Sequence, residues 1–311
     1  MTPSASAPGK VLWAGEYAVL DGHPAVLTAV DRRAEACLVD APPPPSPFLA
    51  AVIDEIARRL GPDSDAARAA ARVAVDSSQL RAGGRKLGLG SSAAATVAAT
   101  ALALGTTDGV HAIAHAAHAV AQAPRGSRGS GADVAASVHG GTILVRKTGD
   151  GPLAVTRLLD PPVPWALVWT RQPADTPSLV ARTRALRDRD PRSYDDAVAG
   201  LGAAAAALAA AFDARDPDAT LAAIRLGATA LADLAARSGA PLLPAGWPEW
   251  SRRIERSGGV AKPTGAGGGD LLLVAFPPDA TLPDLDDMTI LTPRVSPRGV
   301  VLAAGSETAY T

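Results

Sequence analysis

The stretch KLGLGSSAAA, residues 86–95, decides the fold of this chain. Its two glycines, Gly88 and Gly90, let the backbone approach a bulky anion, and two serines follow them. The run of small and apolar residues over 91–104 predicts a tightly packed helix that begins directly after the turn. A helix N-terminus presents unpaired N–H groups and roughly half a positive charge, so the stretch predicts a phosphate-binding turn.

This turn has alternative interpretations. It is not a P-loop, because the pattern G-x-x-x-x-G-K-S/T does not occur in the chain. It matches the dinucleotide-binding variant G-x-G-x-x-A, but the acid at the expected distance, Asp108, lies in a Thr-Thr-Asp-Gly turn with no strand before it. The purely structural alternative is an N-capped packing helix. The serines can cap that helix, contact a phosphate or place an oxygen on Mg²⁺.

Three further segments carry candidate chemistry. In APGKVLWAGEYAV, residues 7–19, Lys10 is either a cation that points into a cleft or a surface lysine before a core strand. The glycines of GVAKPTGAGGGD, residues 259–270, suit close backbone contact with a ligand, and a flexible loop is the alternative. In RGSRGSGADVAAS, residues 125–137, two arginines can hold an anion. Asp133 there is either a base or a helix N-terminal acid.

Together the four segments resemble the GHMP kinases, the family of galacto-, homoserine, mevalonate and phosphomevalonate kinases. The likeness is strongest to the phosphomevalonate kinase branch. It departs from that branch at His139, where Tyr or Trp is common, and in the short length of the chain. The segments that carry the branch likeness are GEYAVLDG (15–22), GSGADVA (129–135), WTRQPADTPSLV (169–180) and KPTGAGGGD (262–270).

The resemblance implies a two-domain α+β fold. The N-terminal half, 1–160, would be ribosomal-protein-S5-domain-2-like and the C-terminal half, 161–311, ferredoxin-like, with Mg-ATP between them. It also implies Lys10 and Asp133 as catalytic residues and Ser92 as the Mg²⁺ ligand. The ATP phosphates would be held by Lys86, Gly88, Leu89, Gly90, Ser91, Ser92 and Ala93. The substrate would be bound by Lys10, Glu16, Tyr17, Arg128, Ser130, Gly131, Ser137, Lys262, Gly265, Ala266 and Gly267.

The implied reaction is phosphorylation of (R)-5-phosphomevalonate to 5-diphosphomevalonate, a step of isoprenoid biosynthesis. An alcohol acceptor would need a base such as Asp133, whereas a phosphate acceptor, with a second pKa of ~6, is mostly ionised at neutral pH and needs cations. Lys10, Arg125, Arg128 and Lys262 are the candidates. The alternatives are a kinase of mevalonate or another small alcohol, a decarboxylase relative, and a non-catalytic regulator that binds nucleotide or sugar.

The whole-chain properties favour a globular protein of the cytoplasm. The 311 residues carry a net charge of −1, which argues against a polybasic nucleic-acid binder. The N-terminus lacks a signal-peptide pattern, and the longest strongly apolar run, 201–212, is shorter than the ~18 residues of a membrane span. The single cysteine permits no internal disulfide. We expect no nucleic-acid or membrane partner, and a monomer or homodimer. A zinc site at His111, His115 and His118 is disfavoured, because no acid or cysteine completes it.

Overall fold

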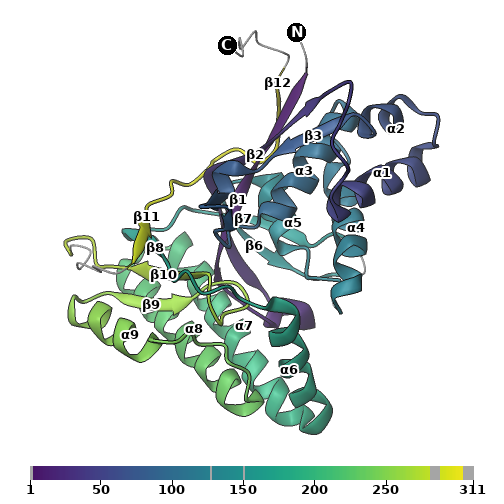
Figure 1. Cartoon of the computed structure of the whole chain (residues 1–311). Helices are drawn as coiled ribbons and strands as arrows, with labels where there is room; N and C mark the ends of the chain where they lie inside the picture. The colour runs from purple at the N-terminus through teal and green to yellow at the C-terminus, as the bar shows by residue number, and fades with distance from the viewer. Residues whose placement is uncertain (1–2, 127, 150, 281–287, 304–311) are drawn as a thin grey trace.

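The structure is a computed structural model, and it describes residues 3–303 apart from residues 127, 150 and 281–287. The chain forms two α+β halves, each built on an antiparallel sheet (Figure 1). This is the mixed α+β architecture that the sequence predicts. The expected hairpin turn at 149–151 includes residue 150, which lies outside the described residues.

The first sheet has the strand order β12-β1-β2-β6-β7, with β3 paired to β2. Every pairing in it is antiparallel. The strands are β1 (Ser4–Ala14), β2 (Ala25–Leu38), β3 (Val73–Asp76), β6 (Thr142–Arg146), β7 (Ala154–Leu158) and β12 (Val301–Ala303). The two strands expected over 24–30 and 34–39 are one continuous strand, β2, because its pairing with β1 runs from Val26 to Cys37, with a register shift at the charged residues between the two expected strands.

The helices of this half pack on one another and on the sheet. They are α1 (Pro47–Leu60), α2 (Asp65–Ala70), α3 (Ser91–Leu104), α4 (Val110–Gln122) and α5 (Ala132–His139). The central helix, α3, occupies the range that the sequence predicts and ends at Gly105 in the left-handed conformation. A short hairpin of β4 (Arg81–Ala82) and β5 (Arg85–Lys86) leads into the glycine turn before it.

The second sheet has the order β11-β8-β10-β9, all antiparallel. Its strands are β8 (Trp165–Trp169), β9 (Val260–Pro263), β10 (Leu271–Ala275) and β11 (Thr289–Leu291). Its helices are α6 (Thr176–Arg189), α7 (Pro191–Asp213), α8 (Pro217–Ser238) and α9 (Trp247–Arg256). One expectation was wrong here, because the expected glycine-rich loop at 258–269 contains strand β9. The charged run at 183–191 is expected to form a solvated face, and it lies largely in helix α6, which Asp175 caps, with most of its side chains exposed.

Helices α7 and α8 reach the length and apolarity of a membrane span among the described residues. Apolar residues of both helices nevertheless pack in the protein core, since Leu208, Phe212 and Ile224 are fully buried against the sheets. A buried core helix passes the same test of length and composition.

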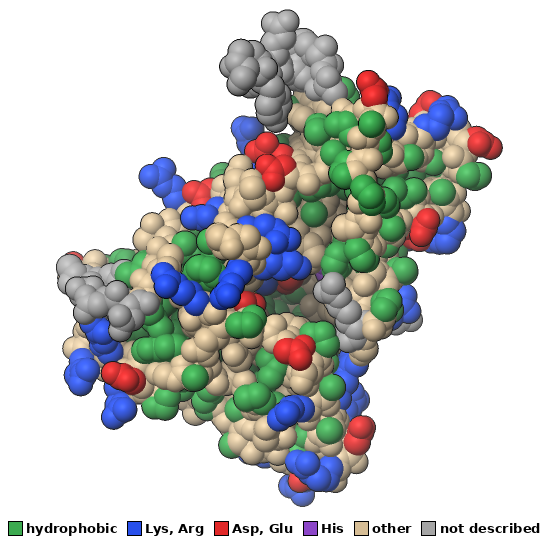
Figure 2. All heavy atoms as spheres, in the orientation of Figure 1, with side chains coloured by type: hydrophobic (Ala, Val, Ile, Leu, Met, Phe, Trp, Pro, Cys, Tyr) green, Lys and Arg blue, Asp and Glu red, His purple; other side chains and the backbone are tan. Residues whose placement is uncertain are grey.

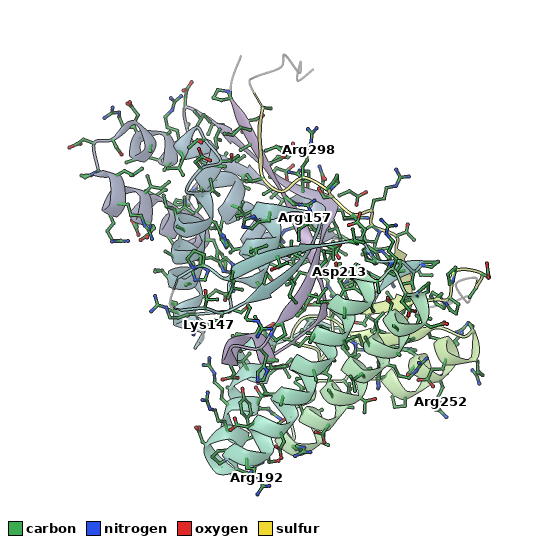
Figure 3. All side chains as sticks on the ribbon, turned by 180° about the vertical axis from the view of Figure 1, so that it is seen from behind. Lys147, Arg157, Arg192, Asp213, Arg252 and Arg298 are labelled. Atoms are coloured by element: carbon green, nitrogen blue, oxygen red, sulfur yellow. The ribbon has the colours of Figure 1, made fainter. Side chains whose placement is uncertain are left out.

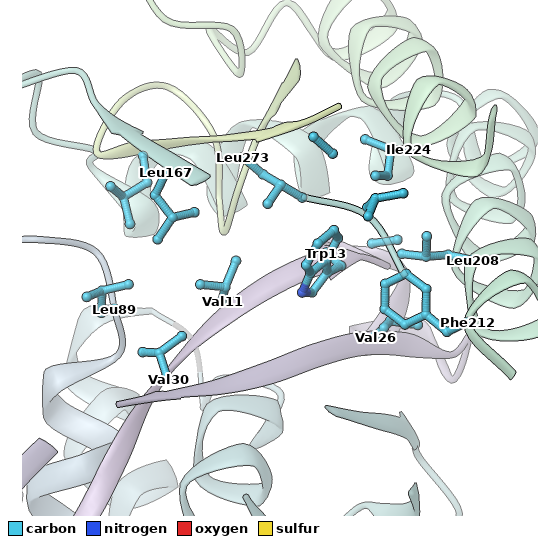
Figure 4. Packing of buried hydrophobic residues seen from close by; sticks show 14 of the residues in the cluster. Val11, Trp13, Val26, Val30, Leu89, Leu167, Leu208, Phe212, Ile224 and Leu273 are labelled. Carbon is cyan, nitrogen blue, oxygen red and sulfur yellow. The ribbon is translucent and has the colours of Figure 1, made fainter. Parts of the chain in front are cut away.

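The core between the halves forms around Trp13 of β1 (Figure 4). The Trp13 ring makes edge contacts with Trp165 and Phe212, at centroid distances of 5.2 Å each. Because side chains alternate along a strand, Val11 and Trp13 face this core, and Leu12 faces the cluster under α5. Lys10, two residues before Leu12, therefore points toward the α5 side of the sheet.

The last described strand returns to the first sheet. Residues 4–6 of β1 pair with 301–303 of β12. The expected domain boundary at residue 160 falls between β7 and β8. This division into two domains stays a proposal, and strand β12 is the part of the second half that pairs with the sheet of the first half.

Candidate active site

The glycine turn is fixed to β1 by the backbone. The Lys10 N–H donates to the Leu89 carbonyl at 2.9 Å, and the Leu89 side chain is buried between the halves. Gly88 and Gly90 flank it with φ angles of +80° and +75°, which side-chain-bearing residues rarely adopt. The first two predicted motifs thus meet in space.

Lys10 and Asp133 form an ion pair beside this turn. The Lys10 Nζ lies 3.3 Å from Asp133 Oδ1, and only 7% of the lysine side chain is exposed against 38% of the aspartate. A methyl group at Gly90 would lie 3.1 Å from Lys10 Cε and 3.5 Å from Asp133 Oδ2. The absence of a side chain at Gly90 therefore makes room for both charged groups.

The first turn of α3 is open to an anion. Its N-cap is Gly90, with no side chain that caps the helix, so the serines do not serve as caps. The unpaired N–H groups and the helix dipole favour a negatively charged group there. The Ser92 hydroxyl lies 3.3 Å from His118 Nε2 of α4, a buried neighbour that sequence reasoning did not pair with it.

Asp270 is a residue that sequence reasoning quoted within a motif but did not assign. A methyl group at Gly88 would lie 3.0 Å from its Cβ and 3.5 Å from its Oδ2, so its carboxyl group faces the glycine turn from the other half. Its φ of +52° is strained for a residue with a side chain. Burial raises the pKa of this carboxyl, while the Ala174 amide and the Lys10 and Lys86 ammonium groups lower it.

The third motif joins the halves through polar side chains. Lys262 donates to Glu16 and, at 2.9 Å, to the Pro263 carbonyl, and the side chains of both Lys262 and Glu16 are 0% exposed. The Tyr17 hydroxyl donates to the Ala266 carbonyl at 2.6 Å. We call these contacts the inter-half latch. Direct substrate contact of Glu16 and Lys262 stays a prediction that this burial disfavours.

Three glycines of the motif lie against the protein, which gives them a structural role, and contact of their backbone with a ligand stays a prediction. A methyl group at Gly267 would lie 2.3 Å from the Leu242 carbonyl oxygen, and one at Gly269 would lie 2.3 Å from the Gln172 carbonyl oxygen. Gly268 is similarly close to Leu179. Gly265 has nothing within 4 Å and faces open space.

The segment before α5 contributes several predicted substrate residues. Ser130 Oγ accepts from the Ala132 N–H at 3.2 Å, which leaves its own proton free to donate. Arg128 is exposed, and the Arg125 side chain lies outside the described residues. Ser137 is fully buried and donates to the Pro8 carbonyl at 2.8 Å, so its hydroxyl positions β1.

The histidines of α4 form no metal site. In the described part of the chain, no group of three His, Cys, Asp or Glu side chains is placed to hold a metal ion. His111 Nδ1 lies 3.2 Å from His139 Nε2. Burial, with the charges of His139 and His115, lowers the pKa of His111 to about 4. This histidine is therefore neutral near pH 7.

An apolar cavity of about 170 Å³ lies one helical turn beyond Ser92. Ala95 and Thr96 of α3 line it, three and four positions after Ser92 and so on the same helix face. The remaining wall comes from the proline-rich connection, α1 and β3. Its other lining residues are Pro43, Pro44, Ser46, Phe48, Leu49, Ala74 and Val75.

Basic side chains gather across the middle of one face, where the two halves meet (Figure 2). An uncapped helix N-terminus, a glycine turn and a buried lysine paired with a carboxylate define a phosphotransferase site. Residues 48–141 match the family described as the GHMP kinases N terminal domain. The chain is 32% identical to a phosphomevalonate kinase of Streptomyces sp. (strain CL190), over 85% of this chain and 87% of the relative. The chain belongs to the GHMP kinase family, which confirms the prediction from its motifs.

Solved structures share this fold. The Lin0012 protein of Listeria innocua superposes with a TM-score of 0.82 at 23% identity, over 98% of this chain and 100% of that one. The Streptococcus pneumoniae phosphomevalonate kinase, solved with phosphomevalonate and AMPPNP, superposes with a TM-score of 0.67 at 17% identity. The superposition covers 88% of this chain and 92% of that enzyme.

Proposed function

We propose that this protein transfers the terminal phosphoryl group of ATP to (R)-5-phosphomevalonate and so forms 5-diphosphomevalonate. The observation that carries the proposal is the Lys10–Asp133 pair, which is held against the glycine turn by the Lys10 backbone. The relative at 32% identity, a phosphomevalonate kinase, supports the choice of acceptor.

The nucleotide would lie along the first turn of α3. The predicted phosphate residues are Lys86 and those from Gly88 to Ala93, whose backbone N–H groups and helix dipole attract anions. The purine would enter the apolar cavity beside Ala95 and Thr96, because that cavity shares a helix face with Ser92. This assignment places the base and the phosphates on one side of α3.

The residues beside the turn fit a magnesium ion. Hard oxygen ligands suit Mg²⁺, and the carboxylates of Asp133 and Asp270 both flank the glycine turn, with the Ser92 hydroxyl in the following helical turn. When bound, Mg²⁺ neutralises part of the phosphate charge. The Asp270 carboxylate would repel bare phosphates, which makes its position consistent with a cation in the site.

Lys10 would stabilise the charge that develops on the transferred group. Its burial strengthens that electrostatic effect, and Asp133 holds its ammonium in place. A phosphate acceptor is already ionised at neutral pH, so Asp133 would orient Lys10 rather than remove a proton. An alcohol acceptor such as mevalonate would instead need Asp133 as a base.

The acceptor would be bound by the segment before α5 and by the open side of the third motif. Arg128, Ser130 and Gly131 belong to the first group, and Gly265 and Ala266 to the second. The buried members of the predicted substrate set would act indirectly. We assign Glu16, Tyr17, Ser137, Lys262 and Gly267 to positioning the two halves and β1. We also propose a cytoplasmic enzyme that is a monomer or homodimer.

The test is ADP release by the purified protein with mevalonate and 5-phosphomevalonate offered side by side. We expect turnover with 5-phosphomevalonate, a loss of more than about 100-fold in kcat for Lys10→Met, and a smaller loss for Asp133→Asn. Turnover of mevalonate without turnover of 5-phosphomevalonate would refute the proposed acceptor. A larger loss for Asp133→Asn than for Lys10→Met would also contradict it.

A further inference from the structure

A second cavity, of about 660 Å³, is lined in part by residues 128–130, the segment before α5. Its walls come from α4, from the turn after β1 and from the β6–β7 hairpin, and Lys147 stands on that hairpin near one end of α4 (Figure 3). The described lining residues are Val19, Leu20, Arg59, Ala112, His115, Ala116, Ala119, Arg128, Gly129, Ser130, Lys147, Gly149, Gly151, Pro152 and Leu153.

The described lining combines basic and apolar side chains. It holds three basic side chains and, among the described residues, no acidic one. Arg59 is already paired with Glu55 at 2.6 Å. Neither Arg128 nor Lys147 forms an ion pair with a described residue, so both ions are available to an anionic ligand.

Two neutral polar groups stand beside these cations. The Ser130 hydroxyl keeps its proton for a ligand, since its oxygen accepts from the Ala132 amide. His115 Nδ1 is buried with no hydrogen-bond partner, and burial together with Arg128 lowers the pKa of this imidazole. His115 Nδ1 faces Gly131 inside the protein, so Ser130 is the group that offers a hydrogen bond, together with the positive charge of Arg128 and Lys147, to a small carboxylate or phosphate.

The cavity adjoins the Lys10–Asp133 pair. Ser130 precedes Asp133 by three residues, across the start of α5. Two wall residues, Val19 and Leu153, pack in one cluster with Leu12, which lies two residues beyond Lys10 on the same face of β1. The cavity and the Lys10–Asp133 pair therefore lie close together, although neither Lys10 nor Asp133 lines the cavity.

We propose that this cavity binds the carboxylate end of the acceptor, with Lys147 and Arg128 as the residues that select for it. The inference rests on the proposed function. In 5-phosphomevalonate the phosphate is the reacting group and must lie at Lys10, so the carboxylate at the other end of the carbon chain needs a separate cationic partner. The apolar wall of Val19, Leu20 and Leu153 suits the methyl and methylene groups between them.

The test removes the positive charge from the cavity and, separately, the carboxylate from the substrate. The variants are Lys147→Met and Arg128→Gln, and the control is Arg146→Ala, an exposed arginine at the end of β6 that does not line the cavity. The substrates are 5-phosphomevalonate and 3-hydroxy-3-methylbutyl phosphate, which lacks only the carboxylate. Lys147 and Arg128 are exposed, so these substitutions leave the fold intact.

With 5-phosphomevalonate we expect KM to rise about 10- to 100-fold in Lys147→Met and Arg128→Gln, with kcat little changed. With the analogue we expect each variant to match the wild-type protein and Arg146→Ala. An equal loss with both substrates, or no loss with either, would overturn the inference.

The proposed function fails by a different result, which is wild-type turnover of mevalonate but not of 5-phosphomevalonate. Mevalonate also carries the carboxylate, so the same comparison made with mevalonate and 3-methylbutane-1,3-diol still tests the cavity. A KM effect of Lys147→Met that depends on the carboxylate would then support the inference without the proposed acceptor.

Discussion

Removal of one partner of the Glu16–Lys262 pair is expected to destabilise the protein more than removal of both. Each side chain is 0% exposed, and one carboxylate oxygen, Glu16 Oε2, is already buried with no hydrogen-bond partner. Glu16→Gln or Lys262→Met would leave a single buried charge uncompensated, which typically costs about 3–5 kcal/mol.

The double variant, Glu16→Gln with Lys262→Met, contains no buried charge at this position. We expect it to recover at least half of the loss of either single variant, because the desolvation cost of both ions disappears. In a chain of this size each kcal/mol shifts Tm by roughly 2–4 °C, so the single variants are expected to melt about 10 °C lower.

The assay is thermal and urea denaturation of the three variants, followed by circular dichroism, with the coupling energy taken from the double-mutant cycle. A matched control is Arg237→Gln, which breaks an exposed ion pair with Asp233 and is expected to cost less than about 1 kcal/mol. A single-variant loss as small as that of the control, or strictly additive losses, would refute the reasoning.

Three further perturbations test the site. Gly90→Ala is expected to lower kcat at least about 10-fold, because its methyl group would lie 3.1 Å from Lys10 Cε. The control is Gly105→Ala, where φ is +66° and no atom lies within 4 Å of the added methyl group. This variant is expected to lose about 1–2 kcal/mol of folding free energy and no activity. Asp270→Asn is expected to raise Tm near pH 7 while it lowers kcat. Burial raises the pKa of Asp270, so the wild-type protein loses stability as pH rises through that pKa, and the gain of the variant should vanish in acid, below the ordinary pKa of an aspartate. His111→Gln is expected to reduce the loss of stability that urea denaturation detects between about pH 6.5 and 4, because the pKa of His111 is lowered to about 4 and the unfolded chain takes up its proton first. Unchanged kcat in Gly90→Ala, lower stability of Asp270→Asn at neutral pH, or the same acid profile in His111→Gln would each contradict its prediction.

Local patterns were sufficient to predict the first half of the site. The turn at Gly88 and Gly90 and the helical run after it are adjacent in sequence, so their structure follows from backbone conformation and helix propensity. Strand β9 was missed for the opposite reason. It is four residues long, lies among glycines, and is stabilised by pairing with β10 rather than by its own composition.

The contacts between the halves could not be read from the sequence. Asp270 and Gly88 are far apart in the chain, and no periodicity indicates that they meet. The one available signal was an aspartate that follows three glycines and directly precedes a buried strand. Lys262 was interpreted as a substrate cation because a phosphate acceptor needs cations, but Glu16 neutralises it inside the protein.

The pairing of β12 with the first residues of β1 has a consequence for protein synthesis. Every residue assigned to the site is translated before residue 301, yet the edge of β1 at residues 4–6 is covered only when β12 has been made. A product that stops early would keep Lys10, the glycine turn and the latch, but it would expose backbone N–H and C=O groups on β1. Such fragments would be prone to associate through that open edge, so truncated chains should be found in aggregates even where the machinery for phosphoryl transfer is complete.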